Sequence, residues 1–394
     1  MQPGDLVLRF EQIFDQTPTL VARGPGRVNL LGEHVDYNGG LALPCAIDRS
    51  ALLAAAPRTD RIVDLIAVDF DERCRFHLDH LDAKVSLDGS PLPQWARYPA
   101  GVAWSLSLTG LTLSGFEGVL TSDVPNGAGL SSSAAIETCL AIAWLALDQE
   151  RMEPLPLAQV CQRAENEYVG LASGLMDQWT SLAGRAGHAL ELDFAGLSAE
   201  LVPLPTAFTI IVADSRERRA LDDSAYNTRV RECQQAAQLL SERIGGSGPL
   251  GALDPAQFEQ VAASLPDLLR RRARHVVTEV DRVRQAVQAL RTGEAERLGE
   301  LMLAGHLSLR DDFEVSTPRL DQLVEAAVSL PGCHGARLTG AGFGGCTVNW
   351  VETGAANEFV GQLTDRYRRN TGVEPRVWIS RASDGAQLLS HGSL

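Results

Sequence analysis

The chain has 394 residues, of which 45% are hydrophobic and 22% charged, a composition typical of a globular protein with room for two or three domains. The formal net charge of -15 argues against nucleic acid or an anionic membrane as a main partner. The seven cysteines show neither a CxxC pair nor Cys/His ligand spacing, and no apolar run is long enough to span a bilayer. We therefore expect a soluble, cytoplasmic protein with reduced thiols and no zinc site.

The first half of the chain mixes predicted strands and helices. Apolar residues at helical spacing predict a helix over residues 4–15. Strand-like residues on both sides of Gly24-Pro25-Gly26 favour a hairpin or a bulged strand pair. Further strands are predicted at 50–57, at 62–69 and up to Thr121, and helices at 95–108, 131–147 and 156–168.

The second half is richer in predicted helix. Strands at 188–193 and 208–213 bracket a change of domain, with Pro203 and Pro205 in the linker. We expect an N-terminal domain over residues 1–200 and a C-terminal domain over 201–394. The predicted helices of this half are 223–241, 255–264, 268–291, 294–312, 318–329 and 355–370, followed by a last strand near 375–380.

One stretch, Pro125 to Ala135, combines the features of an anion site. Gly127 and Gly129 allow a tight turn and close approach of the backbone. The serines at 131–133 stand at the predicted start of a helix, where free N–H groups and the helix dipole attract anions. The chain contains no GxxxxGKS/T motif, so this is not a Walker A loop. A serine-capped helix after an ordinary turn is the alternative interpretation.

The basic residues limit how an anion could be neutralised. Lys84 is the only lysine of the chain and lies in an acidic, turn-like stretch without motif context. An essential cation is therefore expected to be an arginine or a metal ion.

Glycine-rich turns and carboxylate-bearing loops in one acidic chain suggest phosphoryl transfer, which needs an anion cradle, a divalent cation and a group that orients or deprotonates the acceptor. A hydroxyl with a carboxylate suits Mg²⁺, and Glu165 and Asp177 are both candidates for the carboxylate. A catalytic carboxylate needs a nearby cation that keeps it ionised, and Arg27 is the natural partner. Taken singly, Asp177 also fits a capping or surface carboxylate, and Arg27 an ordinary ion pair.

The polar run Glu33-His34-Val35-Asp36 has two possible interpretations. It offers two carboxylates and an imidazole, as a metal site would, and His34 alone also fits a buried structural histidine. Successive residues of an extended loop point to opposite sides, however. Alternating donors and acceptors suit a polyhydroxylated small molecule better, so we favour a sugar over a metal.

Three segments of the chain resemble the three signature motifs of the GHMP kinases. Residues 127–135 resemble the phosphate-binding motif, and residues 338–345 resemble the third, glycine-rich motif. Residues 26–40, GRVNLLGEHVDYNGG, closely resemble the signature of the galactokinase family within this group. Supporting stretches in the same order are GLMDQ at 174–178, YNTR at 226–229, RHVVTE at 274–279 and HLSLRDDF at 306–313.

This resemblance implies an α+β fold of two domains. The N-terminal domain would be similar to the second domain of ribosomal protein S5, the C-terminal domain would be ferredoxin-like, and the active site would lie in the cleft between them. The implied reaction transfers the γ-phosphate of ATP to the anomeric hydroxyl of D-galactose, giving galactose 1-phosphate and ADP, with Mg²⁺ as cofactor. The partners are then these small molecules, and we expect a monomer.

The resemblance also assigns site residues, position by position. Asp177 and Arg27 match the catalytic pair, and Ser133 and Glu165 match the magnesium site. The sugar-binding positions are Glu33, His34, Val35, Asp36, Gly174, Asp177 and Tyr226. The nucleotide-binding positions are Gly127, Ala128, Gly129, Leu130, Ser131, Ser132, Ser133 and Trp95, the last as a wall of the adenine pocket unless it is a core aromatic.

Four positions depart from the family pattern: Val35 in place of threonine, Ser173 in place of cysteine, Gly305 in place of serine and Val230 in place of arginine. None removes a catalytic group, but two of them flank the sugar loop, so the choice of sugar stays open. A kinase for a related sugar such as N-acetylgalactosamine is one alternative. A non-catalytic galactose sensor is another, which the intact phosphate loop and the Arg27 and Asp177 pair argue against.

Overall fold

The computed structural model describes residues 1–218, 224–244 and 248–389. The α-helices are α1 (Pro3–Phe14), α2 (Arg97–Ser107), α3 (Ser132–Leu147), α4 (Pro154–Arg163), α5 (Met176–Ala183), α6 (Ser224–Ile244), α7 (Pro255–Val261), α8 (Asp267–Thr292), α9 (Ala295–Asp311), α10 (Pro318–Val328) and α11 (Ala356–Thr371). The strands are β1 (Leu20–Asn29), β2 (Leu41–Ala42), β3 (Pro44–Arg58), β4 (Ile62–Ala67), β5 (Glu72–His77), β6 (Gly115–Ser122), β7 (His188–Asp193), β8 (Ser198–Pro203), β9 (Phe208–Asp214), β10 (Cys333–Thr339), β11 (Cys346–Glu352), β12 (Arg376–Ser380) and β13 (Gln387–Leu388). Short helices include η1 (Asp36–Asn38), η3 (Leu78–Ala83), η4 (Gln94–Ala96), the π-helix η5 (Ala164–Val169) and η6 (Leu250–Ala252).

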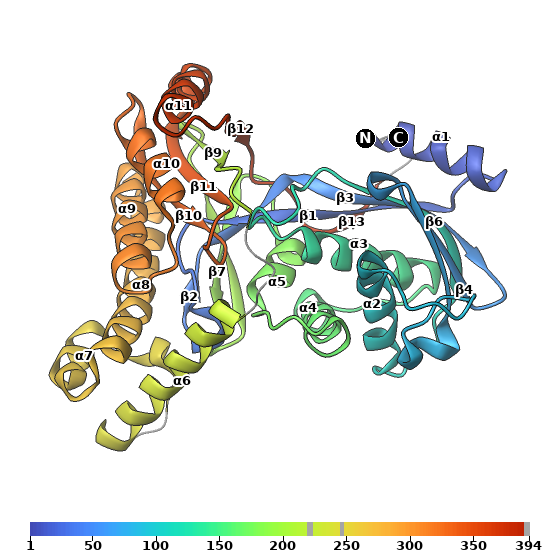
Figure 1. Ribbon diagram of the computed structural model, residues 1–394, viewed down its shortest axis with the longest axis horizontal. Coiled ribbons are helices and arrows are strands. Elements are labelled where there is room, and N and C mark those ends of the chain that lie inside the picture. Colours follow the sequence, from blue (N-terminus) through green and yellow to red (C-terminus); the bar gives the residue numbers. More distant parts are fainter. Residues whose placement is uncertain (219–223, 245–247, 390–394) are drawn as a thin grey trace.

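The N-terminal half is built on a six-stranded sheet of order β13-β1-β3-β6-β4-β5, in which only the pairing of β4 with β6 is parallel. Helices α2, α3, α4 and α5 lie on one side of the long strands and α1 on the other (Figure 1). Leu6 and Phe10, four residues apart on α1, pack on Val21 and Val119, so this helix buries one apolar stripe. The larger core lies on the opposite face of the sheet, under α2 and α3.

Helix α3 approaches β1 very closely at Gly24. A Cβ atom there would lie 2.1 Å from the carbonyl oxygen of Ala135, so only glycine fits. A bulge between Pro25 and Arg27 shifts the register of β1 against β3. Beyond it, the Arg27 backbone N–H donates to Leu130 O at 3.1 Å. The contact brings Arg27 beside the glycine-serine loop that precedes α3.

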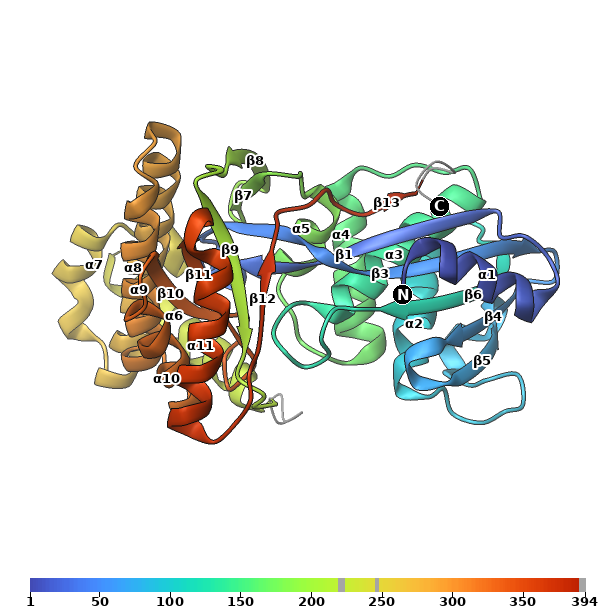
Figure 2. The same ribbon diagram turned by 90° about the horizontal axis from the view of Figure 1, so that it is seen from above.

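The C-terminal half is built on an antiparallel four-stranded sheet of order β10-β11-β9-β12. One face packs on α10 and α11 through residues such as Ile211, Val351 and Phe359. Alternate strand residues, Val212 and Trp350 among them, face the opposite side and join the core that includes α9. The long helices α8 and α9 lie side by side along this half in both views (Figures 1 and 2).

Two connections join the halves. A three-stranded sheet of order β2-β7-β8 lies between them, and the chain returns after β12 so that β13 pairs with the first half of β1 (Figure 2). The Arg23 guanidinium holds this returning segment by donating to Asp384 O at 3.0 Å. The domain boundary between residues 200 and 201 stays a prediction; that position falls inside β8.

Most predicted elements are present, with several differences. The segment around Gly24-Pro25-Gly26 is one bulged strand, so the hairpin alternative was wrong. The helix predicted at 156–168 ends as α4 and continues as the π-helix η5. Residue 223, where the first helix of the second half was expected to begin, lies outside the described residues. The short elements β5, β8, β13 and α5 were not anticipated.

Candidate active site

A cleft of about 260 Å³ lies where the two halves meet. From the N-terminal half it is lined by Arg27, Glu33, His34, Asp36, Tyr98, Asn126, Gly127, Gly129, Leu130, Ser131, Ser132, Ser133, Glu165, Leu171, Ala172, Ser173, Gly174, Met176 and Asp177. From the C-terminal half it is lined by Tyr226, Gly340 and Ala341. The cleft thus brings together residues from all three motifs found in the sequence.

Asp177 and Arg27 form an ion pair in this cleft. The Nε of Arg27 donates to Asp177 Oδ1 at 2.9 Å, and its Nη2 lies 2.7 Å from the same oxygen. The remaining nitrogen, Nη1, donates to Gly129 O at 2.7 Å, while the Ser131 hydroxyl donates to Asp177 Oδ2. Arg27 is nearly buried and the Asp177 side chain is 29% exposed, so the carboxylate keeps one side open to the cleft. The ion pair is thereby tied to the phosphate loop on two sides.

The phosphate loop has the backbone geometry of a tight anion-binding turn. Gly127 and Gly129 have φ of 64° and 78°, and Ser131, immediately before α3, has φ of 60°. A Cβ atom on Gly129 would lie 2.8 Å from Thr339 O. One on Gly340 would lie 2.7 Å from Gly129 O. These glycines let the phosphate loop and the third motif touch backbone to backbone, with the N-terminus of the 16-residue helix α3 at the cleft.

Glu33 is the most deeply enclosed carboxylate of the sugar loop. Its Oε2 accepts a hydrogen bond from Asn29 Nδ2 at 3.0 Å, and its Oε1 accepts one from the Gly340 backbone N–H at 2.7 Å. Burial raises the pKa of Glu33 to about 7, although Arg337 and Arg27 oppose the rise. This side chain therefore links the sugar loop to the third motif across the cleft.

His34 is held by groups from both halves. Its Nε2 lies 3.0 Å from Ala341 O, and its Nδ1 lies 2.9 Å from the Tyr37 hydroxyl. A carbonyl only accepts, so Nε2 carries the proton and Nδ1 accepts from Tyr37. The imidazole also packs on Phe313 and Tyr226, with ring centroids 4.7 and 5.6 Å away. The unusual φ of 61° at His34 turns the loop so that this packing is possible.

Asp36 faces the cleft over Gly174. A Cβ atom on Gly174 would lie 1.5 Å from Asp36 Oδ2, so a side chain at 174 would displace the carboxylate. Burial, with the nearby Asp177 charge, raises the pKa of Asp36 to about 6. Glycine at 174 is thus required by the position of Asp36.

Ser133 and Glu165 line the same part of the cleft. Burial raises the pKa of Glu165, and hydrogen bonds from the side chains of Ser173 and Ser133 oppose the rise. Glu165 stands on the π-helix η5, and its Oε2 accepts from Gln178 Nε2 at 2.9 Å. The same amide nitrogen donates to Glu137 Oε2 at 3.0 Å behind it. One hydroxyl and one carboxylate therefore face the phosphate loop with support from a buried amide.

Three predicted residues lie elsewhere. The Val35 side chain is buried in an apolar cluster with Met176 and Val280 and does not line the cleft. Ala128 is fully buried in the core. The Trp95 indole donates to Glu72 at 2.6 Å, packs against the N-terminal core and does not line this cleft, so its place in an adenine pocket stays a prediction.

Other lining residues were not anticipated. Tyr98, in the first turn of α2, also lines the cleft. Asn126 immediately precedes the phosphate-binding motif and Ala341 lies inside the third motif, so their nearness to predicted residues in the sequence was the one available signal. Leu171 and Ala172 belong to the segment between η5 and α5.

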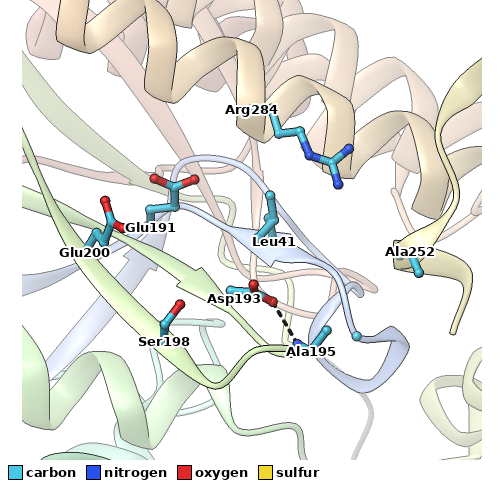
Figure 3. Close-up of a pocket in the computed structure, with 10 residues that line it drawn as sticks. Leu41, Glu191, Asp193, Ala195, Ser198, Glu200, Ala252 and Arg284 are labelled. Carbon is cyan, nitrogen blue, oxygen red and sulfur yellow. Dashed lines mark hydrogen bonds between the residues drawn. The ribbon is translucent and has the colours of Figure 1, made fainter. Parts of the chain in front are cut away.

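A second cavity, of about 460 Å³, shares no lining residue with this cleft (Figure 3). It is lined by strand residues such as Glu191 and Asp193, by Gly251 and Ala252 of η6, and by Arg284 of α8. None of the predicted site residues lines it. Across residues 1–218, 224–244 and 248–389, no helix is both long and apolar enough to cross a membrane.

Comparison with known proteins identifies the family. Models described as "GHMP kinases N terminal domain" and "GHMP kinases C terminal" match residues 97–185 and 286–369, and the "Galactokinase galactose-binding signature" matches residues 8–57. A galactokinase from Roseiflexus sp. (strain RS-1) is 44% identical over 388 residues, which cover 98% of this chain and 97% of that relative. The chain belongs to the galactokinase family.

Other galactokinases agree over the same extent. Human galactokinase is 40% identical over 387 residues, covering 96% of this chain and 95% of its own. The crystal structure of Lactococcus lactis galactokinase complexed with galactose superposes with a TM-score of 0.93 at 32% identity, covering 98% of this chain and 99% of that one. The predicted two-domain α+β fold of a galactokinase is therefore confirmed.

Proposed function

We propose that this chain phosphorylates D-galactose with ATP, giving galactose 1-phosphate and ADP. The observation that carries the proposal is the Arg27 and Asp177 ion pair, which lies in one cleft with the phosphate loop and the sugar loop. Phosphoryl transfer depends on positioning and on charge stabilisation, and this cleft supplies groups for both. The galactose held by the Lactococcus lactis relative supports the choice of acceptor.

The sugar and the nucleotide would occupy opposite ends of the cleft. Glu33, Asp36 and Tyr226 offer polar groups for the sugar hydroxyls, and the ring of His34 lines the same end of the cleft. At the other end, the turn at Gly127 and Gly129 and the N-terminus of α3 offer backbone N–H groups for the phosphates. The two ends meet at Asp177.

Asp177 would orient the anomeric hydroxyl and accept its proton as the bond to phosphorus forms. Its Oδ1 is engaged by Arg27 and its Oδ2 by Ser131, which fix the plane of the carboxylate. A group held in place beforehand pays little entropy at the moment of reaction. Arg27, fixed by Gly129 O, would also stabilise negative charge that develops on the transferred group.

The residues present fit a magnesium ion. Ser133 and Glu165 supply the oxygen donors that Mg²⁺ prefers, and both line the cleft beside the phosphate loop. No complete cage of three acidic, histidine or cysteine side chains occurs in the described part of the chain. Mg²⁺ commonly takes one or two carboxylates and completes its shell with waters and substrate phosphates, so two residues suffice. When bound, the ion would neutralise charge on the phosphates.

Removal of the metal tests this site. We expect EDTA to abolish activity and Mg²⁺ to restore it, and we expect Glu165→Gln to raise the Mg²⁺ concentration for half-maximal activity by about tenfold. Glu167→Gln, an exposed residue on the same π-helix, is the matched control and should leave that concentration unchanged. Full activity in EDTA would rule out the assignment of Ser133 and Glu165.

A panel of hexoses with ATP, read out by coupled detection of ADP, tests the function itself. We expect D-galactose to be the best acceptor. A preference for N-acetylgalactosamine would assign the chain to another acceptor, and galactose binding without any turnover would make it a sensor. The cytoplasmic location and the monomeric state stay predictions from the sequence.

A further inference from the structure

Helix α8 presents two buried polar side chains to the sugar loop. His275 and Glu279 are four residues apart, so they lie on the same face of the helix, and both are fully buried. Neither lines the cleft. Both belong to the C-terminal half, whereas the sugar loop follows β1 of the N-terminal half.

Glu279 receives hydrogen bonds from three directions. Its Oε1 accepts from the Gly32 backbone N–H at 2.8 Å and from Arg337 Nη1 at 2.7 Å. Its Oε2 accepts from Arg282 Nε at 2.7 Å. Burial alone would raise the pKa of this carboxyl, but Arg337 and Arg282 hold it well below its usual range, so Glu279 is ionised. The carboxylate is a fixed anchor for the backbone at Gly32.

His275 bonds the backbone of the next residue. Its Nε2 lies 3.2 Å from Glu33 O, and its Nδ1 lies 2.9 Å from the Ser308 hydroxyl on α9. The carbonyl must accept, so Nε2 donates and Ser308 donates to Nδ1. Burial lowers the pKa of His275 to about 4, which keeps the imidazole neutral. Phe313 packs on this ring and on His34, with centroid distances of 4.5 and 4.7 Å.

These contacts begin where the support from the N-terminal sheet ends. Leu30 and Leu31 still pair with Leu43 through backbone hydrogen bonds. At the next residue, the Gly32 N–H donates to Glu279. At the residue after it, the Glu33 carbonyl accepts a hydrogen bond from His275. The direction in which the Glu33 and His34 side chains leave the backbone is therefore set from α8.

We propose that His275 and Glu279 are positioning residues that set the affinity for the sugar by holding Gly32 and Glu33 in place. The inference rests on the proposed function, since it assumes that Glu33 and His34 contact the acceptor sugar. We call the hydrogen bonds from His275 and Glu279 to Glu33 and Gly32 the clamp. Loss of one of these bonds would let the sugar loop sample other conformations, so sugar binding would carry the added entropic cost of ordering the loop. Nucleotide binding, which uses the phosphate loop, would be unaffected.

The test compares His275→Leu, His275→Gln and Ser308→Ala. We expect His275→Leu to raise the galactose KM by about tenfold, and Ser308→Ala to raise it by about threefold, as for the loss of one hydrogen bond. A glutamine amide can still donate to Glu33 O, so His275→Gln should stay within about threefold of the wild type. The ATP KM should change by less than about twofold in all three.

Tyr367→Phe is the matched control. The Tyr367 hydroxyl donates to Ser215 O at 3.0 Å in the C-terminal core, away from the sugar loop. Its removal should lower thermal stability as much as Ser308→Ala does and leave the galactose KM unchanged. Equal shifts of both KM values in the clamp variants, or a galactose KM shift in Tyr367→Phe, would overturn the proposal.

The outcomes for the two proposals can be separated. Absence of wild-type turnover on D-galactose counts against the proposed function alone, and the comparison is then repeated with whichever hexose the panel selects. Wild-type turnover with an unchanged galactose KM in His275→Leu counts against the clamp. If His275→Leu does not fold, Ser308→Ala decides, and an unchanged galactose KM in that variant overturns the proposal.

Discussion

The three guanidinium nitrogens of Arg27 bind both Asp177 and the phosphate loop, so a replacement residue must make both contacts. Nε and Nη2 hold Asp177, and Nη1 holds Gly129 O of the phosphate loop. The fork of a guanidinium can make these contacts together, whereas the single ammonium of lysine cannot. The chain, with its one lysine, uses arginine for almost every such contact.

We expect Arg27→Lys to lower kcat by about a hundredfold, because charge is kept while the geometry is lost. Arg73→Lys is the control, since Arg73 holds Asp64 with the same fork at 2.7 Å and lies outside the cleft. Steady-state kinetics of both variants check this. Equal activity of the two variants would show that the fork at Arg27 has no special role.

The sequence predicted cleft residues whose type is dictated by chemistry, but it did not predict the direction in which neighbouring side chains pack. Arg27, Glu33 and Asp177 all line the cleft as predicted. Val35 does not, because its side chain packs in the apolar cluster beside Met176. The hydrogen bond from Trp95 to Glu72 likewise depends on a strand, β5, that the sequence did not reveal.

At the scale of elements, the π-helix η5 matters most for the site. The wide turn over Ala164–Val169 carries Glu165 and leads into the cleft wall at Leu171. Tyr168 anchors this turn. Its hydroxyl donates to Leu81 O at 2.6 Å, and Lys84 Nζ donates to Tyr168 O at 2.6 Å while lying 4.6 Å from the centre of its ring.

Lys84→Met should therefore loosen the π-helix. We expect faster amide hydrogen exchange across residues 164–173, and little change in Lys84→Arg, which can still donate to the carbonyl. Exchange measured by mass spectrometry checks this, with the α3 peptide as the internal reference. Unchanged exchange in Lys84→Met would contradict the anchoring role of this residue.

The helix pattern of the sequence could not reveal the π-helix. The prediction of one helix over 156–168 followed apolar periodicity, which hardly differs when one extra residue enters a turn. Here the turn fits against α2 at Gly101, where a Cβ atom would lie 3.1 Å from the Tyr168 ring. Such packing arises only in the tertiary structure, as does the pairing of short strands such as β13.

At the scale of the whole molecule, the two halves share charged and polar groups that the sequence does not place together. Glu33 bonds Gly340, His275 bonds Glu33 O, and Arg337 bonds both Glu279 and Leu30 O. The resemblance of the motifs to those of the GHMP kinases implied two domains with a cleft between them. The sequence did not predict these contacts between residues 242 and 307 positions apart, since no local pattern encodes them.

This interface makes stability depend on pH. The pKa of His275 is about 4 in the folded chain and near 6.5 when unfolded, so the unfolded state binds the proton first as pH falls. The stability due to neutral His275 is fully present above pH 6.5 and is lost as pH falls toward 4. Glu33 has the opposite effect, because its pKa of about 7 in the folded chain lies above its usual value. The stability due to protonated Glu33 is present at low pH and is lost as pH rises through 7.

The His275→Gln variant isolates the histidine, because Glu33 is present in both proteins. We expect the wild type to lose about 2 kcal/mol of unfolding free energy relative to His275→Gln between pH 7.5 and pH 5. Chemical denaturation at the two pH values checks this. An equal change in both proteins would show that His275 does not titrate as its burial demands.

Asp177, in the cleft between the halves, is the residue that we propose acts directly on the acceptor hydroxyl. Asp177→Asn keeps the shape of the side chain but removes the charge that Arg27 and Ser131 hold in place. We expect galactose binding, measured by calorimetry, to persist while turnover falls by about a hundredfold or more. Asp79→Asn, a carboxylate paired with Arg61 at 2.7 Å outside the cleft, should leave turnover unchanged. Turnover near the wild-type level in Asp177→Asn would contradict this role of Asp177.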